Sequence, residues 1–347
     1  MESPSKDLKI IKVSLLIITA VVILFVLRLF SFIFIPLFLA LFIALLLLPL
    51  LDWFARKKIP NWLGITFIVL SSSLFIFLNI KVFQNTASEL YASKGEIIAS
   101  ANQKINPLIS DIRNYLGLAE YTDTVTPVID VGQYIEDNSG KLIGKIWIFG
   151  SGLFMTIFFL ALFLTGAHLF EIYISGITKD NKRIIEIFRN VIDTLNSFIK
   201  VKFFVSALTG IIFGLIVMFF GVKFALFWGF VAFLLNFVQL IGSIFITTVL
   251  IFFGFVELNS TGTLLIFSSL LIATQVIIGG IWEPILMGQS FKINTISILI
   301  SLALWGFVFG VAGLILAIPI TVFLKMILEQ IPATERIARM MSRIQDK

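Results

Sequence analysis

The chain has 347 residues, of which 59% are hydrophobic and only 13% are charged. A globule of this length cannot hide that much apolar surface from water, so the composition predicts an integral membrane protein. Cysteine is absent, and the single histidine, His168, excludes a multi-histidine metal site. Without cysteine the chain has no disulfide, thiolate nucleophile or iron–sulfur site, and we expect no cofactor.

Residues 1–80 predict three membrane spans. Apolar runs cover 13–27, 29–51 and 62–80, and each is bounded by polar or charged residues. No small-residue cleavage site follows the first run, so we interpret the first two runs as an uncleaved hairpin and not as a signal peptide. The turn before the third run is basic, which places this turn and the amino terminus in the cytoplasm.

Residues 81–145 predict a small helical insert outside the cytoplasm. The segment carries six basic and eight acidic residues, and its apolar residues recur at helical spacing. The segment is too short to form a hydrophobic core by itself, so we expect its helices to pack on neighbouring elements. The fourth span, 146–167, then returns the chain to the cytoplasm.

Residues 168–202 are basic and carry one apolar helical face. Such a helix lies along the inner membrane surface or serves as a cytoplasmic connector, and the sequence leaves both interpretations open. With Lys325 and the carboxy-terminal tail 329–347 included, the proposed cytoplasmic regions hold 17 of the 26 lysine and arginine residues. This distribution explains the net charge of +6 as membrane orientation and argues against nucleic-acid binding.

Residues 203–328 form the predicted transport core, which opens with a fifth span at 203–220. This span contains Gly210 and Gly214, a pair of small residues four positions apart. The spacing places both glycines on one side of a helix and lets a second helix approach closely. We therefore expect a tight helix crossing at this point.

Two uncharged runs dominate the transport core. They cover 224–256 and 293–324 and are 33 and 32 residues long, whereas about 20 residues of helix cross the hydrocarbon of a bilayer. A shorter span, 263–281, lies between them. Each long run is interrupted, and whether it crosses the membrane once or folds back as a re-entrant hairpin stays open. The residues predicted to break or hinge these helices are Gly242, Pro284, Gly288, Gly306, Gly310, Gly313 and Pro319.

Each long run carries a row of polar side chains at helical spacing. The two rows predict a substrate path lined by Asn236, Gln239, Ser243, Thr247, Asn294, Ser297 and Ser301. A buried amide without a partner is costly in hydrocarbon, so Asn236 and Gln239 must face another polar group or water. An interhelical hydrogen bond would satisfy either residue alone, but two such rows together favour a path for a polar solute.

Glu283 is the only acidic residue between Asn259 and Glu329. An ionisable group inside a membrane segment is a functional candidate by default, so Glu283 is the candidate for coupling to protons or sodium ions. Its place beside Pro284 also suits a solvated helix end, and the sequence does not separate these roles. No phosphate-binding loop or catalytic motif accompanies it, so we expect transport driven by an ion gradient and not an enzyme.

Three stretches resemble the signatures of the autoinducer-2 exporter family of bacterial permease-like membrane proteins. They are NFVQLIGS at 236–243, EPILMGQSFKIN at 283–294 and LWGFVFGVAGLILAIPITVFLK at 304–325. The order of elements is similar over nearly the whole chain, although Gln239 and Thr295 stand where the family usually has proline. The resemblance implies a secondary transporter that exports a small polar solute such as a quorum-sensing autoinducer, or a sodium/proton antiporter, assembled as a homo-oligomer.

The sequence therefore predicts an all-α, polytopic protein of the bacterial cytoplasmic (inner) membrane, with about eight membrane segments and both termini in the cytoplasm. Its expected partners are the lipid bilayer, the small polar solute and the coupling protons or sodium ions. A protein of another class stays possible on this sequence: a non-transporting membrane scaffold that binds a partner through the external insert. In that case residues 81–145 would be essential, while Asn236 and Gln239 would be dispensable.

Overall fold

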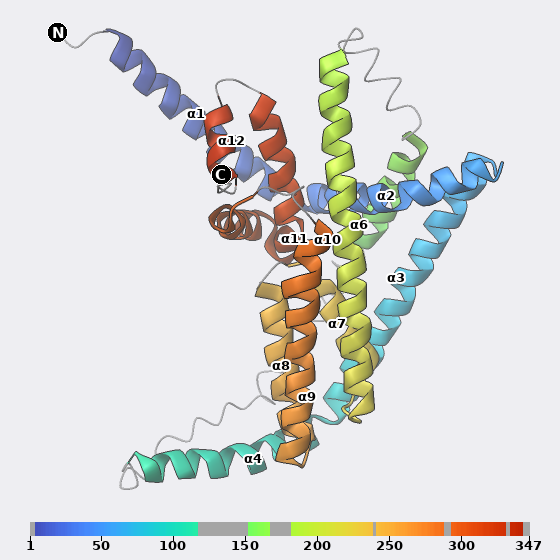
Figure 1. Ribbon diagram of the computed structural model, residues 1–347, viewed down its shortest axis with the longest axis vertical. Coiled ribbons are helices and arrows are strands. Elements are labelled where there is room, and N and C mark those ends of the chain that lie inside the picture. Colours follow the sequence, from blue (N-terminus) through green and yellow to red (C-terminus); the bar gives the residue numbers. More distant parts are fainter. Residues whose placement is uncertain are drawn as a thin grey trace. The chain divides into compact units, whose positions relative to one another are not determined.

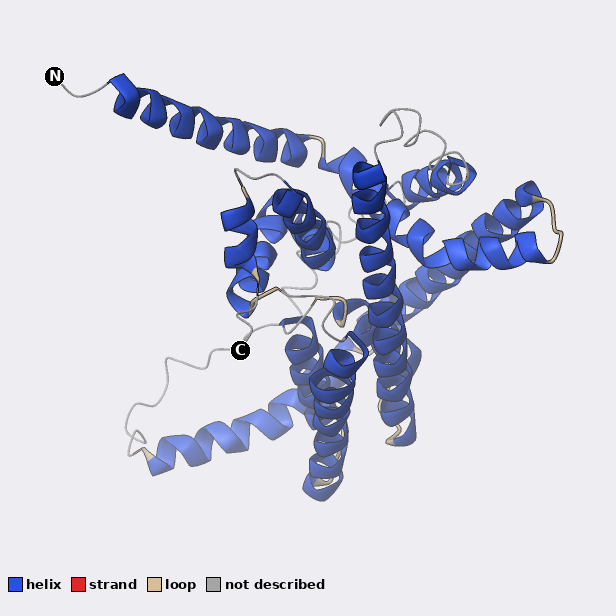
Figure 2. Ribbon diagram, turned by 45° about the horizontal axis from the view of Figure 1, so that its top comes forward, coloured by secondary structure: helices blue, strands red, loops and turns tan. Residues whose placement is uncertain are grey.

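Figure 2 shows the computed structural model of the chain, in which every regular element of the described residues is a helix. The described residues are 4–116, 152–166, 182–238, 241–287, 293–330 and 334–342. Five helices in these ranges are long and apolar enough to cross a membrane, and four shorter apolar helices accompany them. The predicted all-α, polytopic membrane class is therefore confirmed. Gln239, Gly288 and residues 117–145 of the predicted external insert lie outside the described residues.

The chain divides into two compact units. Unit 1 comprises Met1–Ser71, Gly150–Lys200 and Met287–Lys347, and unit 2 comprises Ser72–Phe149 and Val201–Leu286. Two long helices, α3 (Asn61–Ala92) and α6 (Lys182–Phe219), contribute a part to each unit.

In unit 1, α1 (Pro4–Leu29) leads into α2 (Ser31–Arg56) with only Phe30 between them. A helical hairpin needs a connection of about 2–5 residues, and Figure 1 shows α2 continuing away from α1. The predicted pairing of the first two spans is therefore wrong. Helix α2 instead folds back on α3, where the ring centroids of Phe54 and Phe67 lie 5.5 Å apart, edge to face.

Helix α2, the start of α3 and the helix Gly152–Gly166 share one apolar core. Its buried members are Ala40, Ala44, Ile68, Leu160 and Leu164. The two alanines stand four residues apart on α2, and their small side chains let the neighbouring helices approach. Pro36 and Pro49 both lie inside α2, and neither ends the helix.

Helix α6 is continuous over 38 residues and joins the predicted amphipathic segment to the fifth span. The apolar face of its first part is buried against α2 and the last long helix, α11 (Thr295–Gln330). This face contributes Val191, Leu195, Phe198 and Ile199 to a core that also contains Leu45, Ile318 and Val322. Because protein covers the face, the interpretation that it lies along the membrane surface is wrong.

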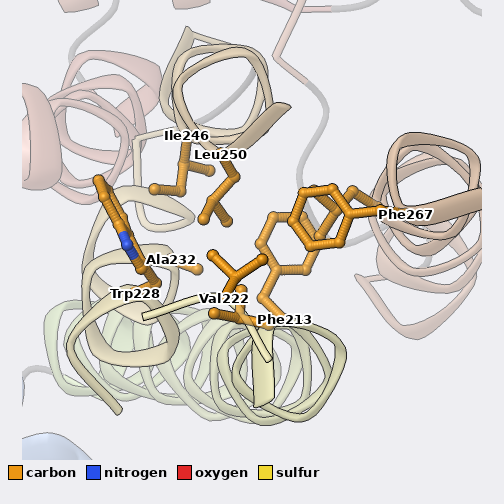
Figure 3. Packing of buried hydrophobic residues seen from close by; sticks show 9 residues of the cluster. Phe213, Val222, Trp228, Ala232, Ile246, Leu250 and Phe267 are labelled. Carbon is orange, nitrogen blue, oxygen red and sulfur yellow. The ribbon is translucent and has the colours of Figure 1, made fainter. Parts of the chain in front are cut away.

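Unit 2 contains the second parts of α3 and α6 and a group of shorter helices. They are α4 (Lys94–Tyr115), α7 (Ala225–Leu235), α8 (Ile241–Glu257), α9 (Thr261–Thr274), the π-helix η1 (Gln275–Trp282) and most of α10 (Glu283–Met287). Figure 3 shows side chains from four helices pointing toward one another, namely Phe213 from α6, Trp228 from α7, Leu250 from α8 and Phe267 from α9. This apolar cluster holds the helices of unit 2 together.

Gly210 and Gly214 of α6 lie against Gly229 of α7. A Cβ atom on Gly210 would lie 2.6 Å from the Gly229 carbonyl oxygen, and one on Gly229 would lie 2.8 Å from the Gly210 carbonyl oxygen. The two main chains are therefore in contact, and a side chain at the crossing would force them apart. The tight crossing predicted from the spacing of Gly210 and Gly214 is confirmed.

The first uncharged run folds back on itself instead of crossing once. A turn separates α7 from α8, and the ring centroids of Trp228 on α7 and Phe253 on α8 lie 5.2 Å apart, so the two helices run antiparallel. Gly242 permits the reversal, because a Cβ atom there would overlap the carbonyl oxygen of Leu235. We call residues 225–257 the first hairpin.

The second uncharged run is also a hairpin. Helix α11 is interrupted at Gly310, whose φ of 63° and ψ of −141° do not occur in a helix. Trp305 Nε1 in the first arm donates to Thr321 Oγ1 in the second arm at 3.1 Å, across 16 residues of chain. A Cβ atom on Gly313 would overlap the carbonyl oxygen of Trp305, so glycine lets the arms close. We call residues 295–330 the second hairpin.

Candidate transport site

The buried polar residues of α6 in unit 2 lie on one face of the helix. Lys202, Ser206 and Thr209 are four and three residues apart, a spacing that keeps them on one side, and each is at most 2% exposed. Thr209 donates its hydroxyl proton to the Val205 carbonyl oxygen of its own helix. Lys202 and Ser206 bond to other elements, and these bonds define a candidate site.

Lys202 forms a buried ion pair with Glu283. The Lys202 Nζ lies 2.6 Å from Glu283 Oε1, and the two side chains are 2% and 7% exposed. A single buried charge is costly, whereas two paired charges compensate each other. Glu283 directly follows the π-helix, and π-helical turns are frequent at functional sites. Glu283 is buried, so the solvated helix end considered from the sequence is wrong.

Lys202 is the site residue that the sequence pattern did not reveal. It is the last of the basic residues in the segment assigned to the cytoplasm, and this context conceals its place inside a membrane-length helix. The sequence feature that could have identified Lys202 is its spacing from Ser206 and Thr209, which places the three residues on one face of a helix. Its partner Glu283 is 81 residues away in the sequence, a separation that no local pattern encodes.

Asn236 joins the turn of the first hairpin to α6. Its Nδ2 donates to Ser206 Oγ at 3.1 Å, and the residue is buried. Since Ser206 lies one helical turn from Lys202, the hairpin turn and the ion pair are attached to the same face of α6. Further along this hairpin, Thr247 is buried and donates to the Ser243 carbonyl oxygen of its own helix.

The predicted path residues of the second hairpin bond to nearby main chain. Asn294 stands just before α11, where its Oδ1 accepts from the Ser297 main-chain N–H at 2.7 Å and its Nδ2 donates to the Met340 carbonyl oxygen at 2.7 Å. Ser301 is buried and donates to the carbonyl oxygen three residues earlier. Asn294 thus caps the first arm and holds α12 (Glu335–Met341) beside it.

Three further predicted break positions lie within helices. Pro284 lies inside the continuous helical run Thr261–Met287, just after the π-helix, and Pro319 lies inside the second arm of α11. A Cβ atom on Gly306 would lie 2.7 Å from Leu314 Cδ2, so this glycine packs across the reversal. The reversal itself is made at Gly310.

Lys104 of α4 closes the free end of α8. Its Nζ donates to the carbonyl oxygens of Phe255, Val256 and Leu258 at 2.9, 2.9 and 2.7 Å. The last carbonyls of a helix have no partner within it, and a positive charge there also complements the helix dipole. Lys104 therefore stabilises the base of the first hairpin, at the end of α8 away from Asn236.

Replacing Lys104 by methionine is expected to loosen this base. Loss of the charge-assisted bonds should lower the free energy of unfolding by about 2 kcal/mol. Thermal unfolding in detergent and hydrogen exchange at residues 254–258 would measure the change, and exchange there should become faster. Lys81→Met, at an exposed lysine of α3, is the control and should leave both measurements unchanged. Unaltered exchange in Lys104→Met would contradict the stabilising role.

Membrane-length apolar helices, two glycine-dependent hairpins and a buried ion pair define a multi-pass helical membrane protein with a polar site within its helices. The sequence profile described as AI-2E family transporter matches residues 15–333. The chain therefore belongs to the AI-2E transporter family, as the resemblance of its signatures implied. Its role is membrane transport, and it is a multi-pass protein of the bacterial inner membrane.

Curated relatives match this chain over most or part of its length. A putative transport protein of Haemophilus influenzae is 27% identical over 310 residues, which are 86% of this chain and 86% of the relative. The AI-2 transport protein TqsA of Escherichia coli K12 is 27% identical over 352 aligned residues, 99% of this chain and 98% of TqsA. The putative transport protein YrrI of Bacillus subtilis is 28% identical over 140 residues, 40% of this chain and 39% of YrrI.

Proposed function

We propose that the protein is a secondary transporter that exports a small polar organic solute, with autoinducer-2 as the first candidate. Family membership supports transport, and the name of the relative TqsA, an AI-2 transport protein, supports this solute. The resemblance of the signature stretches supports a homo-oligomer.

The turn of the first hairpin is the observation that carries the proposal. A reversal inside an apolar run places a non-helical stretch of polar main chain between the end of α7 and the start of α8. The buried amide of Asn236 lies at the same turn and bonds to Ser206. Together these groups offer a polar solute the donors and acceptors that it needs inside a membrane.

In this proposal the polar rows of the two hairpins line the solute path. The lining residues are Asn236, Gln239, Ser243, Thr247, Asn294, Ser297 and Ser301. The glycines of the reversals act as hinges, and Glu283 couples solute movement to an ion gradient.

The path is tested by the Asn236→Leu variant in inside-out membrane vesicles. Uptake of labelled autoinducer-2 is expected to fall about tenfold, because one lost hydrogen bond costs roughly 1.5 kcal/mol and about 1.4 kcal/mol is tenfold in rate. The matched control is Asn79→Leu, at a half-buried asparagine whose Nδ2 donates to the Phe75 carbonyl oxygen of its own helix, and it should transport like the wild type.

Three outcomes would contradict the proposal. Equal uptake by Asn236→Leu and wild-type vesicles would show that the turn of the first hairpin does not line the solute path. Equal uptake by vesicles with and without the protein would show that the protein does not transport this solute. If deletion of residues 81–145 abolished function while Asn236→Leu were harmless, the scaffold interpretation would replace it.

The buried ion pair favours one second function, sodium/proton exchange. No group of three or more histidine, cysteine or acidic residues that could hold a metal ion occurs among the residues that the structure describes. A sodium ion would therefore depend on hydroxyl and carbonyl oxygens beside Glu283. Sodium-dependent proton movement in vesicles should be lost in Glu283→Gln, and full exchange by this variant would exclude Glu283 as the coupling group.

A further inference from the structure

We propose that the Lys202–Glu283 ion pair is the proton-binding site that drives transport: protonation of Glu283 breaks the pair, and the released Lys202 ammonium opens the Ser206–Asn236 bond at the turn of the first hairpin. This inference rests on the proposed transport function. It identifies the coupling ion as the proton and adds Lys202 as a coupling residue.

Within residues 201–286 the ion pair stands apart from the other charges. Residues 201–286 contain only four charged side chains, Lys202, Lys223, Glu257 and Glu283. The main-chain N–H of Lys223 donates to Glu257 Oε2 at 2.7 Å, so those two residues lie together at the base of the first hairpin. Helices α7, α9 and η1 carry no ionisable residue, and α8 carries only Glu257. Among the described residues of unit 2, Lys202 is thus the charged group that faces Glu283.

The remaining charges of the described part of unit 2 stand on α3 and α4. They are Lys81, Glu89, Lys94, Glu96, Lys104, Asp111 and Arg113. Two of them bond at the base of the hairpin, since Lys104 caps α8 and Glu96 pairs with Lys223 at 3.4 Å. On α6 the nearest other charge is Lys200, which is exposed. A proton that binds Glu283 therefore alters the Lys202–Glu283 pair and leaves the Glu96–Lys223 pair intact.

The pair and the hairpin turn are joined through α6. Lys202 holds the start of α10 at 2.6 Å, and one helical turn further Ser206 holds Asn236 at 3.1 Å. In the π-helix before Glu283, the buried Nε2 of Gln275 has no hydrogen-bond partner among the described residues. An unsatisfied buried donor raises the free energy of this arrangement, which favours a second arrangement once the pair opens.

The proton step is balanced without a further reactant. A proton that enters from one side of the membrane adds to the Glu283 carboxylate and makes it a neutral carboxyl group, while Lys202 keeps its own proton. An unpaired ammonium is costly in apolar surroundings, so Lys202 competes with Asn236 for the Ser206 hydroxyl oxygen one turn away. Release of the proton to the other side restores the pair, and one proton crosses per cycle.

The test uses the full-length chain in liposomes of phosphatidylethanolamine and phosphatidylglycerol. Labelled autoinducer-2 reports solute uptake, and pyranine in the lumen reports proton movement. With the lumen one pH unit more acidic, the wild type is expected to accumulate solute about tenfold more than without a gradient, and the lumen should lose protons. In the neutral double variant Lys202→Met/Glu283→Gln this accumulation ratio is expected to fall to about one. Lys202→Arg/Glu283→Asp retains a titratable ion pair and should keep the gradient response.

The outcomes separate the two proposals. A wild type that takes up no solute with or without a gradient would overturn the proposed function. The proton site alone would be overturned if solute uptake by the wild type did not depend on the pH gradient. The same conclusion would follow if the neutral double variant kept the full gradient response. If the double variant does not fold, Glu283→Gln replaces it, because glutamine can still bond to Lys202 but cannot take up a proton, and a full gradient response there would overturn the inference equally.

Discussion

Gly313→Ala is expected to prevent closure of the second hairpin. A Cβ atom at this position would overlap the Trp305 carbonyl oxygen and lie 2.6 Å from the Trp305 carbonyl carbon. Both obstacles are main-chain atoms, so the two arms must separate, and the bond between Trp305 and Thr321 is lost with them. Overpacking of this kind costs about 1–3 kcal/mol. Because rigid main chain blocks the methyl group, we expect a value at the upper end.

Thermal unfolding of the purified protein in detergent measures this effect. Gly242→Ala should behave in the same way in the first hairpin, where the Leu235 carbonyl group is the obstacle. Gly306→Ala should be milder, because the flexible end of Leu314 can move away. Gly280→Ala meets no atom within 4 Å and is the control, which we expect to be neutral or stabilising by about 0.5–1 kcal/mol. A Gly313→Ala protein as stable as the control would refute the hairpin geometry.

Lys202→Met is expected to destabilise the protein strongly. The substitution leaves the Glu283 carboxylate buried without its partner, and breaking a buried ion pair from one side costs about 3–5 kcal/mol. Lys202→Met/Glu283→Gln should recover most of this loss, because replacing both members of such a pair is often neutral or better. The expected order of stability is therefore wild type close to the double variant, with the single variant far below.

The same unfolding measurement checks this order. Lys200→Met is the matched control, since Lys200 stands two residues earlier on α6 and is exposed. It should change the free energy of unfolding by less than about 0.5 kcal/mol. Equal stability of Lys202→Met and Lys200→Met would mean that Glu283 finds water or another partner, and the buried pair would then not control this part of the fold.

Local sequence patterns predicted the membrane class and much of the helical structure. Uncharged runs longer than a bilayer crossing marked 224–256 and 293–324 as unusual, and the spacing of Gly210 and Gly214 predicted the tight crossing that α7 completes. These predictions succeed because the hydrophobicity of a segment and the size of a side chain act locally. Glu283 was also identified locally, as an isolated acid in an apolar region.

Pairings between distant segments were not accessible in this way. The sequence predicted a hairpin of the first two spans, whereas α2 pairs with α3, because three adjacent apolar helices look alike whichever two fold together. Asn294 shared the helical spacing of Ser297 and Ser301 but stands before the helix, where it caps α11 and holds α12. The spacing rule assigns a face and does not say where a helix begins.

The sequence alone determined that this is a helical membrane transporter of its family, with two long interrupted apolar runs. Both conclusions depend on local features, namely the lengths of the apolar segments and the signature stretches of the family. Only the tertiary structure decided that the first run turns back before Gly242, that the second turns back at Gly310 and that Lys202 meets Glu283. In a membrane, the lipid tails are as apolar as the side chains of neighbouring helices. The hydrophobicity of a segment therefore cannot distinguish a helix that crosses the membrane from one that turns back within it. A close main-chain approach and a buried ion pair depend on contacts between residues far apart in the sequence, and those contacts exist only in the folded molecule.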